Sequence, residues 1–310
     1  MSATAFIAVN WGSSTFAAYL IEPASGIVDR HRTANGVTRL DRDALPAALA
    51  EAVVGWPKTE HIYCSGMIGS SAGWVEVPHL DCPATLLEVS RSLTQTRIGD
   101  VNCSIVPGLA AILPNGDPDV LRGEEMEIFG LVALQGAATP TLHAVLPGTH
   151  TKWVRVSDGS VSEFFTSMGG ELFDRLAEKS LLSSVLDKEQ SAISDEWFAR
   201  GVERGAAEGT GLGRLLFGVR AQVLRARLPK AHAASYARGL LIGAEIEDAI
   251  RMQPQIRSQA SIPLVGNPAL CELYRGALAQ FGVGAHLVDG ASCLLEAYRI
   301  LHHNVVGARP

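Results

Sequence analysis

The sequence lacks the patterns that mark several large classes of protein. Its five cysteines, spread over 310 residues, form no C-x-x-C pair, which argues against a disulfide framework and against a zinc site. Lysine and arginine are scattered along a chain of net charge -6, so no basic face for nucleic acid is expected. No apolar run could span a bilayer, and the first residues have neither the charged nor the long apolar region of a secretory signal. We expect a cytoplasmic protein that binds neither nucleic acid nor membrane.

The common nucleotide-binding motifs are also missing. The sequence contains neither G-x-x-x-x-G-K-[ST] nor a G-x-G-x-x-G that follows a strand. A glycine cluster at 209–213 stands between two expected helices, where a flexible connection is the better interpretation. Hydrophobic residues make up 47% and charged residues 19%, an ordinary globular balance. A chain of this length can form one large domain or two medium ones.

One pattern occurs twice. The stretches 6–19 and 143–155 each run from an apolar strand through a glycine turn into a returning strand. Aligned at Gly12 and Gly148, both place hydroxyl residues one and three positions after the glycine. Glycine lets a backbone approach a ligand closely, and successive amides in such a turn bind anions. Either copy alone would suggest an ordinary hairpin, but the duplication favours phosphate binding.

The remaining chain alternates helices and strands. We expect strands near 26–28, 61–64, 103–106, 261–265 and 285–288, and helices at 45–54, 86–93, 124–134, 170–182, 194–204, 213–227, 232–252, 269–280 and 291–302. The run L-P-N-G-D-P-D at 113–119 favours a linker. The sequence therefore predicts an α/β fold of two related lobes, 1–118 and 119–310, with a cleft between them.

Several motifs carry a resemblance to a known family. Such paired turns resemble those of the actin-like ATPase superfamily, whose lobes are ribonuclease-H-like. At finer grain the chain resembles the 2-dehydro-3-deoxygalactonokinase family. The matching stretches are 8–14 (A-V-N-W-G-S-S), 36–40 (G-V-T-R-L), 66–74 (G-M-I-G-S-S-A-G-W), 122–125 (R-G-E-E), 147–154 (P-G-T-H-T-K-W-V), 217–221 (F-G-V-R-A) and 239–245 (G-L-L-I-G-A-E).

The resemblance implies a carbohydrate kinase of galactonate catabolism. Such an enzyme uses ATP and Mg²⁺ to phosphorylate the terminal hydroxyl of 2-dehydro-3-deoxy-D-galactonate, a 2-keto-3-deoxy sugar acid. ATP is expected to contact two phosphate clamps and an adenosine-binding turn, which comprise Gly12, Ser13 and Ser14, then Gly148, Thr149 and His150, then Gly266 and Asn267. A homodimer is the candidate assembly.

Three charged residues are candidates for the chemistry. Either Glu124 or Glu125 is expected to accept the proton of the sugar hydroxyl, and we favour Glu124. Acidic residues at a helix start also suit the helix dipole whatever the function. Lys152 is expected to meet a phosphate or the substrate carboxylate, although a solvated lysine on a strand is the plainer alternative.

The substrate is an anion with hydroxyl groups, so its pocket should offer a cation and several donors. The candidate residues in the first lobe are Arg39, Gly66, Met67, Ser70 and Trp74, and Arg122, in the second, is another possibility. For Arg39, a surface residue that caps a loop is an equal alternative.

The chain departs from the family pattern at a few positions. Asn10 stands where the family has Asp, Ala17 where it has Arg, and Glu127 where Gln is usual. In the superfamily that Asp faces the metal, and a neutral amide serves Mg²⁺ less well. We therefore expect Asn10 to contact the metal weakly, through water. Two alternatives stay open: a weak relative that acts as a sensor or regulator, and a kinase for a neighbouring keto-deoxy acid.

Overall fold

The computed structural model describes residues 5–136, 141–187, 196–207, 209 and 211–307. Its contacts divide the chain into two compact units. Unit 1 comprises Met1–Thr141, Val156–Phe164 and Gly290–Pro310, and unit 2 comprises Leu142–Arg155 and Phe165–Asp289. The lobe boundary expected after residue 118 stays a prediction, because compact contact units need not coincide with evolutionary lobes. None of the helices in the described ranges is long and apolar enough to cross a membrane.

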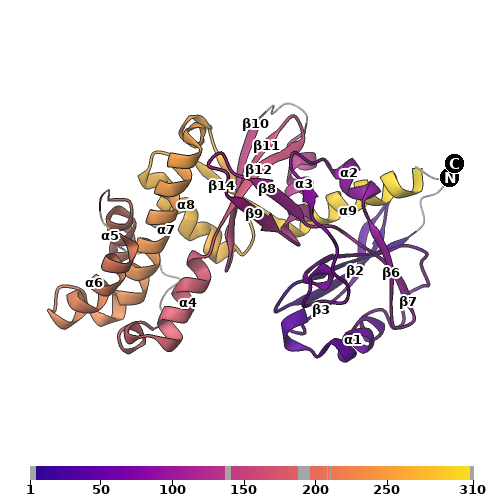
Figure 1. Ribbon diagram of the computed structural model, residues 1–310, viewed down its shortest axis with the longest axis horizontal. Helices are drawn as coiled ribbons and strands as arrows, with labels where there is room; N and C mark the ends of the chain where they lie inside the picture. The colour runs from indigo at the N-terminus through magenta and orange to yellow at the C-terminus, as the bar shows by residue number, and fades with distance from the viewer. Residues whose placement is uncertain (1–4, 137–140, 188–195, 208, 210, 308–310) are drawn as a thin grey trace. The chain divides into compact units, whose positions relative to one another are not determined.

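Unit 1 is built on a mixed sheet with the strand order β3-β2-β1-β4-β7-β6 (Figure 1). Its strands are β1 (Phe6–Trp11), β2 (Phe16–Glu22), β3 (Gly26–Thr33), β4 (Ile62–Gly66), β6 (Thr94–Ile98) and β7 (Val101–Ile105). The central strand β1 runs antiparallel to β2 and parallel to β4. Strand β1 is almost wholly buried, as its apolar sequence requires. Its side chains join α1 (Leu45–Ala52) in the core of this unit.

A smaller sheet in unit 1 corrects one interpretation of the sequence. Strands β5 (Leu80–Asp81), β8 (Leu109–Ile112) and β9 (Pro118–Leu121) pair in that order. The expected linker at 113–119 supplies the turn between β8 and β9, where Leu113 N donates to Asp117 O at 2.8 Å. Proline and glycine interrupt helices and strands in linkers and in hairpin turns alike, so composition did not distinguish the two.

Three helices complete unit 1, and the last of them comes from the C-terminal end of the chain. Helix α9 (Gly290–Gly307) packs against α3 (Glu124–Gln135) and α2 (Leu86–Arg91) (Figure 1, yellow). The contact with α3 is close, because a β-carbon on Gly130 would lie 1.8 Å from the Cys293 carbonyl oxygen. Tyr298 of α9 donates to Ser65 at 2.7 Å and to the Val9 carbonyl at 3.2 Å. Helix α9 therefore ties α3 to the central strands.

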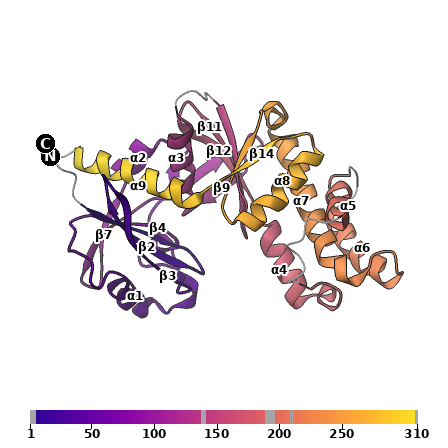
Figure 2. The ribbon, with the colours of Figure 1, turned by 180° about the vertical axis from the view of Figure 1, so that it is seen from behind.

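Unit 2 combines most of the second sheet with a helical bundle, while residues Val156–Phe164 of that sheet are grouped with unit 1. The sheet has the order β12-β11-β10-β13-β14, with bounds β10 (Thr141–Leu146), β11 (Thr151–Ser157), β12 (Ser160–Ser167), β13 (Ile262–Val265) and β14 (Ala285–Val288). The helices are α4 (Gly169–Lys179), α5 (Glu196–Gly205), α6 (Leu212–Leu224), α7 (Ala233–Met252) and α8 (Pro268–Gln280). Helices α5 and α6 lie beside α7 (Figure 2).

The packing of α5 on α7 explains part of a motif. Gly239 and Gly243 of α7 face α5, where a β-carbon on either would lie 2.2 Å from a carbonyl oxygen of Phe198 or Val202. Small residues one turn apart let two helices approach closely, so the glycines of G-L-L-I-G-A-E are structural.

Most expected helices and strands are confirmed within a few residues. The start of the expected helix at 194–204 lies outside the described residues. Thr210 of the glycine cluster also lies outside them. Sequence analysis missed β5, β6, β8, β9 and β12. It also missed the short 3-10 helices at Val37–Arg39, Arg42–Ala44, Met67–Gly69, Leu181–Ser184, Lys230–His232 and Pro254–Ser258.

Candidate functional site

The first glycine turn joins β1 to β2 in unit 1. Gly12 N donates to Thr15 O at 2.9 Å and closes the turn. The amides of Ser13 and Ser14 donate to no other residue in the described part of the chain, and both side chains are exposed. Successive amides without a protein acceptor form a nest that can bind an anion.

A segment from elsewhere in unit 1 supports this turn from one side. The amides of Val37 and Thr38 donate to the Gly12 and Ser13 carbonyls, each at 3.0 Å. Gly36 packs so closely that a β-carbon would lie 2.3 Å from the Ser13 carbonyl oxygen. The carbonyls of the turn thus accept hydrogen bonds from the protein, while the amides of Ser13 and Ser14 have no acceptor among the described residues. This contact explains why G-V-T-R-L accompanies the turn.

The same segment places Arg39 at the surface. Its side chain is exposed and makes no hydrogen bond or ion pair with any described residue. It follows the residues that hold the first turn, within three positions of Gly36. The interpretation as a loop cap gains no support from a bond, and the guanidinium is available to a ligand.

Asn10 lies near the end of β1, two residues before the turn. It is half-buried and pairs with Ala17 on one side and Ser65 on the other. Its side-chain amide has no hydrogen bond within the described residues. Two departures from the family pattern, Asn10 and Ala17, are therefore cross-strand neighbours.

The expected substrate loop begins where β4 ends. Gly66 has a φ of 91°, and a β-carbon there would lie 2.5 Å from the Trp11 carbonyl oxygen, so only glycine fits. The loop then holds itself together: Ser70 Oγ donates to Met67 O at 2.7 Å. Trp74 Nε1 donates to Arg97 O at 2.9 Å. Both polar groups are therefore engaged within the protein.

Arg122 lies next to this loop, and one nitrogen of its guanidinium is hydrogen-bonded within the protein. Nη2 donates to Val77 O at 2.6 Å and lies 3.2 Å from His79 Nε2. Nη1 is buried and has no hydrogen-bond acceptor among the described residues. A β-carbon on Gly69 would lie 2.9 Å from that nitrogen. Burial lowers the pKa of Arg122, and the carboxylates of Glu125 and Glu76 oppose that change.

The two candidate carboxylates at the start of α3 have different environments. Glu125 is fully buried, and one of its oxygens accepts a hydrogen bond from the amide of Gly123, the residue before the helix. Its other oxygen, Oε1, is buried without a hydrogen bond to any described residue. Burial raises the pKa of Glu125 to about 8. Glu124 is half-buried as a residue, with its Oε2 atom buried.

Gly123 brings this helix start to the substrate loop. It has a φ of 111°, and its β-carbon position lies 3.2 Å from Gly66 Cα. The motifs R-G-E-E and G-M-I-G-S, which are far apart in sequence, therefore meet within unit 1. One turn later, burial and the charge of Glu124 raise the pKa of Glu127 to about 7.

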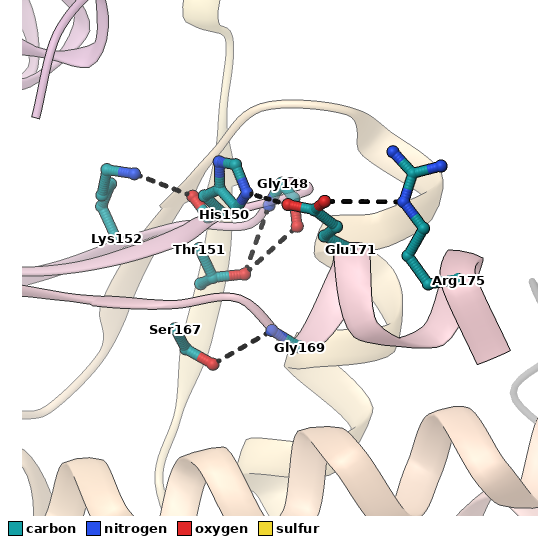
Figure 3. Close-up of polar contacts among 8 residues, drawn as sticks. All are labelled: Gly148, His150, Thr151, Lys152, Ser167, Gly169, Glu171 and Arg175. Carbon is teal, nitrogen blue, oxygen red and sulfur yellow. Dashed lines mark hydrogen bonds and ion pairs between the residues drawn. The ribbon is translucent and has the colours of Figure 1, made fainter.

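The second glycine turn joins β10 to β11 in unit 2 (Figure 3). The Gly148 amide lies 3.4 Å from Thr151 Oγ1. The amides of Thr149 and His150 donate to no described residue. Glycine again supports the turn from outside: a β-carbon on Gly170 would lie 2.5 Å from the Gly148 carbonyl oxygen. The Glu171 amide donates to Thr149 O at 2.9 Å, so this turn repeats the arrangement of the first.

Two expected ligands of the phosphate are engaged with the protein. His150 Nε2 lies 2.6 Å from Glu171 Oε2, and Arg175 lies 3.6 Å from the other oxygen of Glu171 (Figure 3). His150 lowers the pKa of Glu171. Lys152 Nζ donates to the His150 carbonyl at 3.2 Å. The interpretation of Lys152 as a solvated strand residue is wrong, since it is 4% exposed.

The expected adenosine-binding turn follows β13. Gly266 has a φ of 143° and lies against the Pro147 carbonyl, which brings this turn beside the second phosphate clamp. Asn267 Oδ1 accepts from the amides of Ala269 and Leu270 at 3.0 and 3.2 Å, an ordinary helix cap. A small pocket next to the clamp is lined by Gly148, Gly169, Gly170, Arg238, Leu241, Ile242, Glu245, Leu270 and Tyr274.

Sequence reasoning missed the residues that hold the turns. Gly36 and Glu245 stood inside quoted motifs without an expected role, and Gly170 follows another glycine directly after β12. The sequence shows that a glycine or an acidic residue stands at these positions. It does not show what they contact, because their partners lie far away in sequence.

Comparisons with known proteins show the family of the chain. The family model described as 2-keto-3-deoxy-galactonokinase matches residues 10–300. The chain is 33% identical to the 2-dehydro-3-deoxygalactonokinase of Escherichia coli K12, over 97% of this chain and 98% of that protein. It is 35% identical to a Rhizobium meliloti protein assigned to the same activity, over 92% of each chain.

Solved structures add a likeness of fold. A crystal structure from Sinorhizobium meliloti, assigned to the same kinase, matches with a TM-score of 0.86 and 31% identity, over 98% of this chain and all of that one. Component A of the (R)-2-hydroxyglutaryl-CoA dehydratase of Acidaminococcus fermentans matches with a TM-score of 0.54 over 97% of this chain and 99% of that one. At 15% identity that likeness shows a shared α/β fold alone.

Proposed function

The chain belongs to the 2-keto-3-deoxy-galactonokinase family, and we propose that it transfers the γ-phosphoryl group of ATP to the terminal hydroxyl of 2-dehydro-3-deoxy-D-galactonate. It is a carbohydrate kinase that uses a nucleotide. The single observation that carries the proposal is the pair of glycine turns, each with open amides and each supported from outside by another glycine.

Open amides suit phosphate because phosphoryl transfer depends on position and charge rather than on covalent chemistry by the protein. In the first turn, Ser13 and Ser14 offer amides and hydroxyls. In the second, Thr149 and His150 offer amides, while the buried Lys152 adds a positive charge nearby. A turn whose carbonyls are already bonded needs no rearrangement to present its amides. Each turn by itself is therefore a preorganised phosphate site.

Glu124 is the better candidate for the catalytic base. It is half-buried at the start of α3, whereas Glu125 is fully buried, so Glu124 is the less enclosed of the two carboxylates. Glu125 is fully buried and accepts from Gly123, so it holds the backbone at the contact with Gly66. We assign Glu124 to proton acceptance and Glu125 to positioning of the helix start.

Arg122 is the better candidate for the substrate carboxylate. Its Nη1 is buried, charged and without an acceptor from the described residues, next to the substrate loop at Gly69. A buried donor without an acceptor is costly, and a carboxylate would supply an acceptor oxygen to Nη1. Met67 and Gly66 would contact the sugar through the loop backbone, and the exposed Arg39 is a second cation for the same anion.

Magnesium would arrive with the nucleotide. No group of three His, Cys, Asp or Glu residues in the described ranges could hold a metal by itself. Mg²⁺ commonly keeps several waters and binds through substrate phosphates. The free amide of Asn10, two residues before the first turn, fits a contact to metal-bound water. The metal would neutralise charge on the phosphates, and Asn10 would orient its water.

The test is a coupled assay of ATP consumption with 2-keto-3-deoxygalactonate, with and without Mg²⁺, beside calorimetry of nucleotide binding. We expect turnover that requires the sugar acid. Glu124→Gln should lower kcat by roughly 10²–10⁴ and leave ATP affinity nearly unchanged. Nucleotide binding without turnover would favour a sensor. Faster turnover of the gluconate epimer would mean that this epimer, and not the galactonate, is the substrate. Cytoplasmic location and a homodimer stay predictions.

A further inference from the structure

A buried carboxylate in unit 2 accepts hydrogen bonds from three different elements. Glu245 of α7 is 6% exposed. Its Oε1 accepts from Trp153 Nε1 of β11 at 2.8 Å and from Tyr274 OH of α8 at 2.9 Å. Its Oε2 accepts from Ser167 Oγ of β12 at 2.6 Å. Burial raises the pKa of Glu245, and these three donors oppose that rise.

The donors form two chains that lead back to the second glycine turn. Tyr274 donates to Glu245, so its oxygen can accept from Thr151 Oγ1, 2.9 Å away. Thr151 can then accept from the Gly148 amide at 3.4 Å. In the other chain, Ser167 Oγ donates to Glu245 and accepts from the Gly169 amide at 3.3 Å (Figure 3).

Both chains end on backbone that shapes the turn. Gly148 begins the turn, and Gly169 precedes Gly170, which packs against the Gly148 carbonyl and against Thr149. The acceptor at the far end of both chains is the same side chain. A carboxylate suits this place because it only accepts, whereas an amide would present a donor to at least one of the three donors.

We propose that Glu245 is a positioning residue for ATP, which acts through Tyr274, Thr151 and Ser167 to fix the second phosphate-binding turn. The inference rests on the proposed function of that turn. Glu245 does not touch the phosphates in this arrangement. It orients hydroxyls that hold the Gly148 and Gly169 amides, and thereby keeps the amides of Thr149 and His150 directed at the ligand.

Tyr274→Phe is the sharpest test, because it removes the shared hydroxyl and keeps the ring. We expect the Kd for ATP and the KM for ATP to rise about five- to tenfold, the worth of one buried hydrogen bond, with the KM for the sugar acid unchanged. Tyr236→Phe is the matched control: that buried tyrosine of α7 bonds Gln222, outside both chains, and the variant should bind ATP as the parent does.

Two further variants follow the chain itself. Thr151→Val should weaken ATP binding as much as Tyr274→Phe does, and the double variant should be no weaker than either, since both changes break one path. Glu245→Gln should raise the KM for ATP by about tenfold or more. If that variant does not fold, the Tyr274 and Thr151 variants still test whether the hydrogen-bond chain supports ATP binding.

The outcomes separate this inference from the proposed function. If the parent and Tyr274→Phe bind ATP equally, or if Tyr236→Phe loses as much, the inference is overturned and the kinase activity is unaffected. A rise in the KM of both substrates together would also overturn it, because a merely structural loss would act on both. A parent that binds ATP without phosphorylating the sugar acid would contradict the proposed function and leave the Tyr274 comparison intact.

Discussion

At the scale of single residues, two departures from the family pattern, Asn10 and Ala17, are neighbours in the structure. Asn10 and Ala17 face each other across β1 and β2, so they share one face of the sheet. The resemblance gives Asp and Arg at these positions. Loss of both an Asp and an Arg leaves the net local charge unchanged. The metal-facing carboxylate is nevertheless absent.

The pair can be restored stepwise. Asn10→Asp should lower the Mg²⁺ concentration that gives half-maximal rate, because a carboxylate attracts the hard cation that an amide does not. Adding Ala17→Arg should recover stability lost by the single change, with a coupling of about 0.5–1 kcal/mol between directly opposed charges. Mg²⁺ titrations of rate and urea unfolding of the parent, Asn10→Asp, Ala17→Arg and the double variant measure both effects. An identical Mg²⁺ dependence in every variant would remove Asn10 from the metal's surroundings.

Glu127 gives a pH dependence with a definite sign. Its folded pKa is raised from 4.5 to about 7, so the folded protein binds the proton more tightly than the unfolded chain does. The unfolding free energy therefore falls as pH rises from about 4.5 to 7, and the loss is complete above that window. Glu127→Gln, which introduces the usual family residue, should match the parent at pH 4.5 and be more stable by about 2–3 kcal/mol at pH 8. Urea unfolding at the two pH values measures this difference, and a constant difference would contradict it.

At the scale of elements, the two glycine turns share a method of support. A second glycine, Gly36 in unit 1 and Gly170 in unit 2, packs against each turn and occupies its carbonyl side. Amides that follow these glycines donate to the turn carbonyls. The duplication seen in sequence therefore extends to contacts that the sequence alignment did not contain.

Gly36→Ala tests this support. The new β-carbon would meet the Ser13 carbonyl oxygen and the Ser14 carbonyl carbon at 2.3 Å, so the backbone must move. We expect the KM for ATP to rise about tenfold or more, and the unfolding free energy to fall by about 1–3 kcal/mol. Gly218→Ala in α6 is the control, since it has open space and should be neutral or slightly stabilising. Equal behaviour of the two variants would contradict a role for Gly36 in the turn.

At the scale of the whole molecule, sequence order and spatial grouping differ. The last helix, α9, belongs with the first strands, and unit 2 occupies the interior of the chain. The contacts that make α9 part of unit 1 are specific: Gly130 against Cys293, and Tyr298 bonded to Ser65 and to the Val9 carbonyl. Helical periodicity predicted helix α9, but no pattern within its own sequence indicates which residues it contacts.

The sequence by itself determined the alternation of helices and strands, the repeated glycine turn and the family, because periodicity, turn chemistry and motif order are local properties of a chain. It also singled out Glu124, Glu125 and Lys152. Only the tertiary structure decided that Glu125 is fully buried while Glu124 is half-buried, that Lys152 is buried, and that Glu245 accepts hydrogen bonds from three distant elements. Burial and hydrogen bonding depend on which distant segments meet, and a single sequence does not encode those meetings in any local pattern.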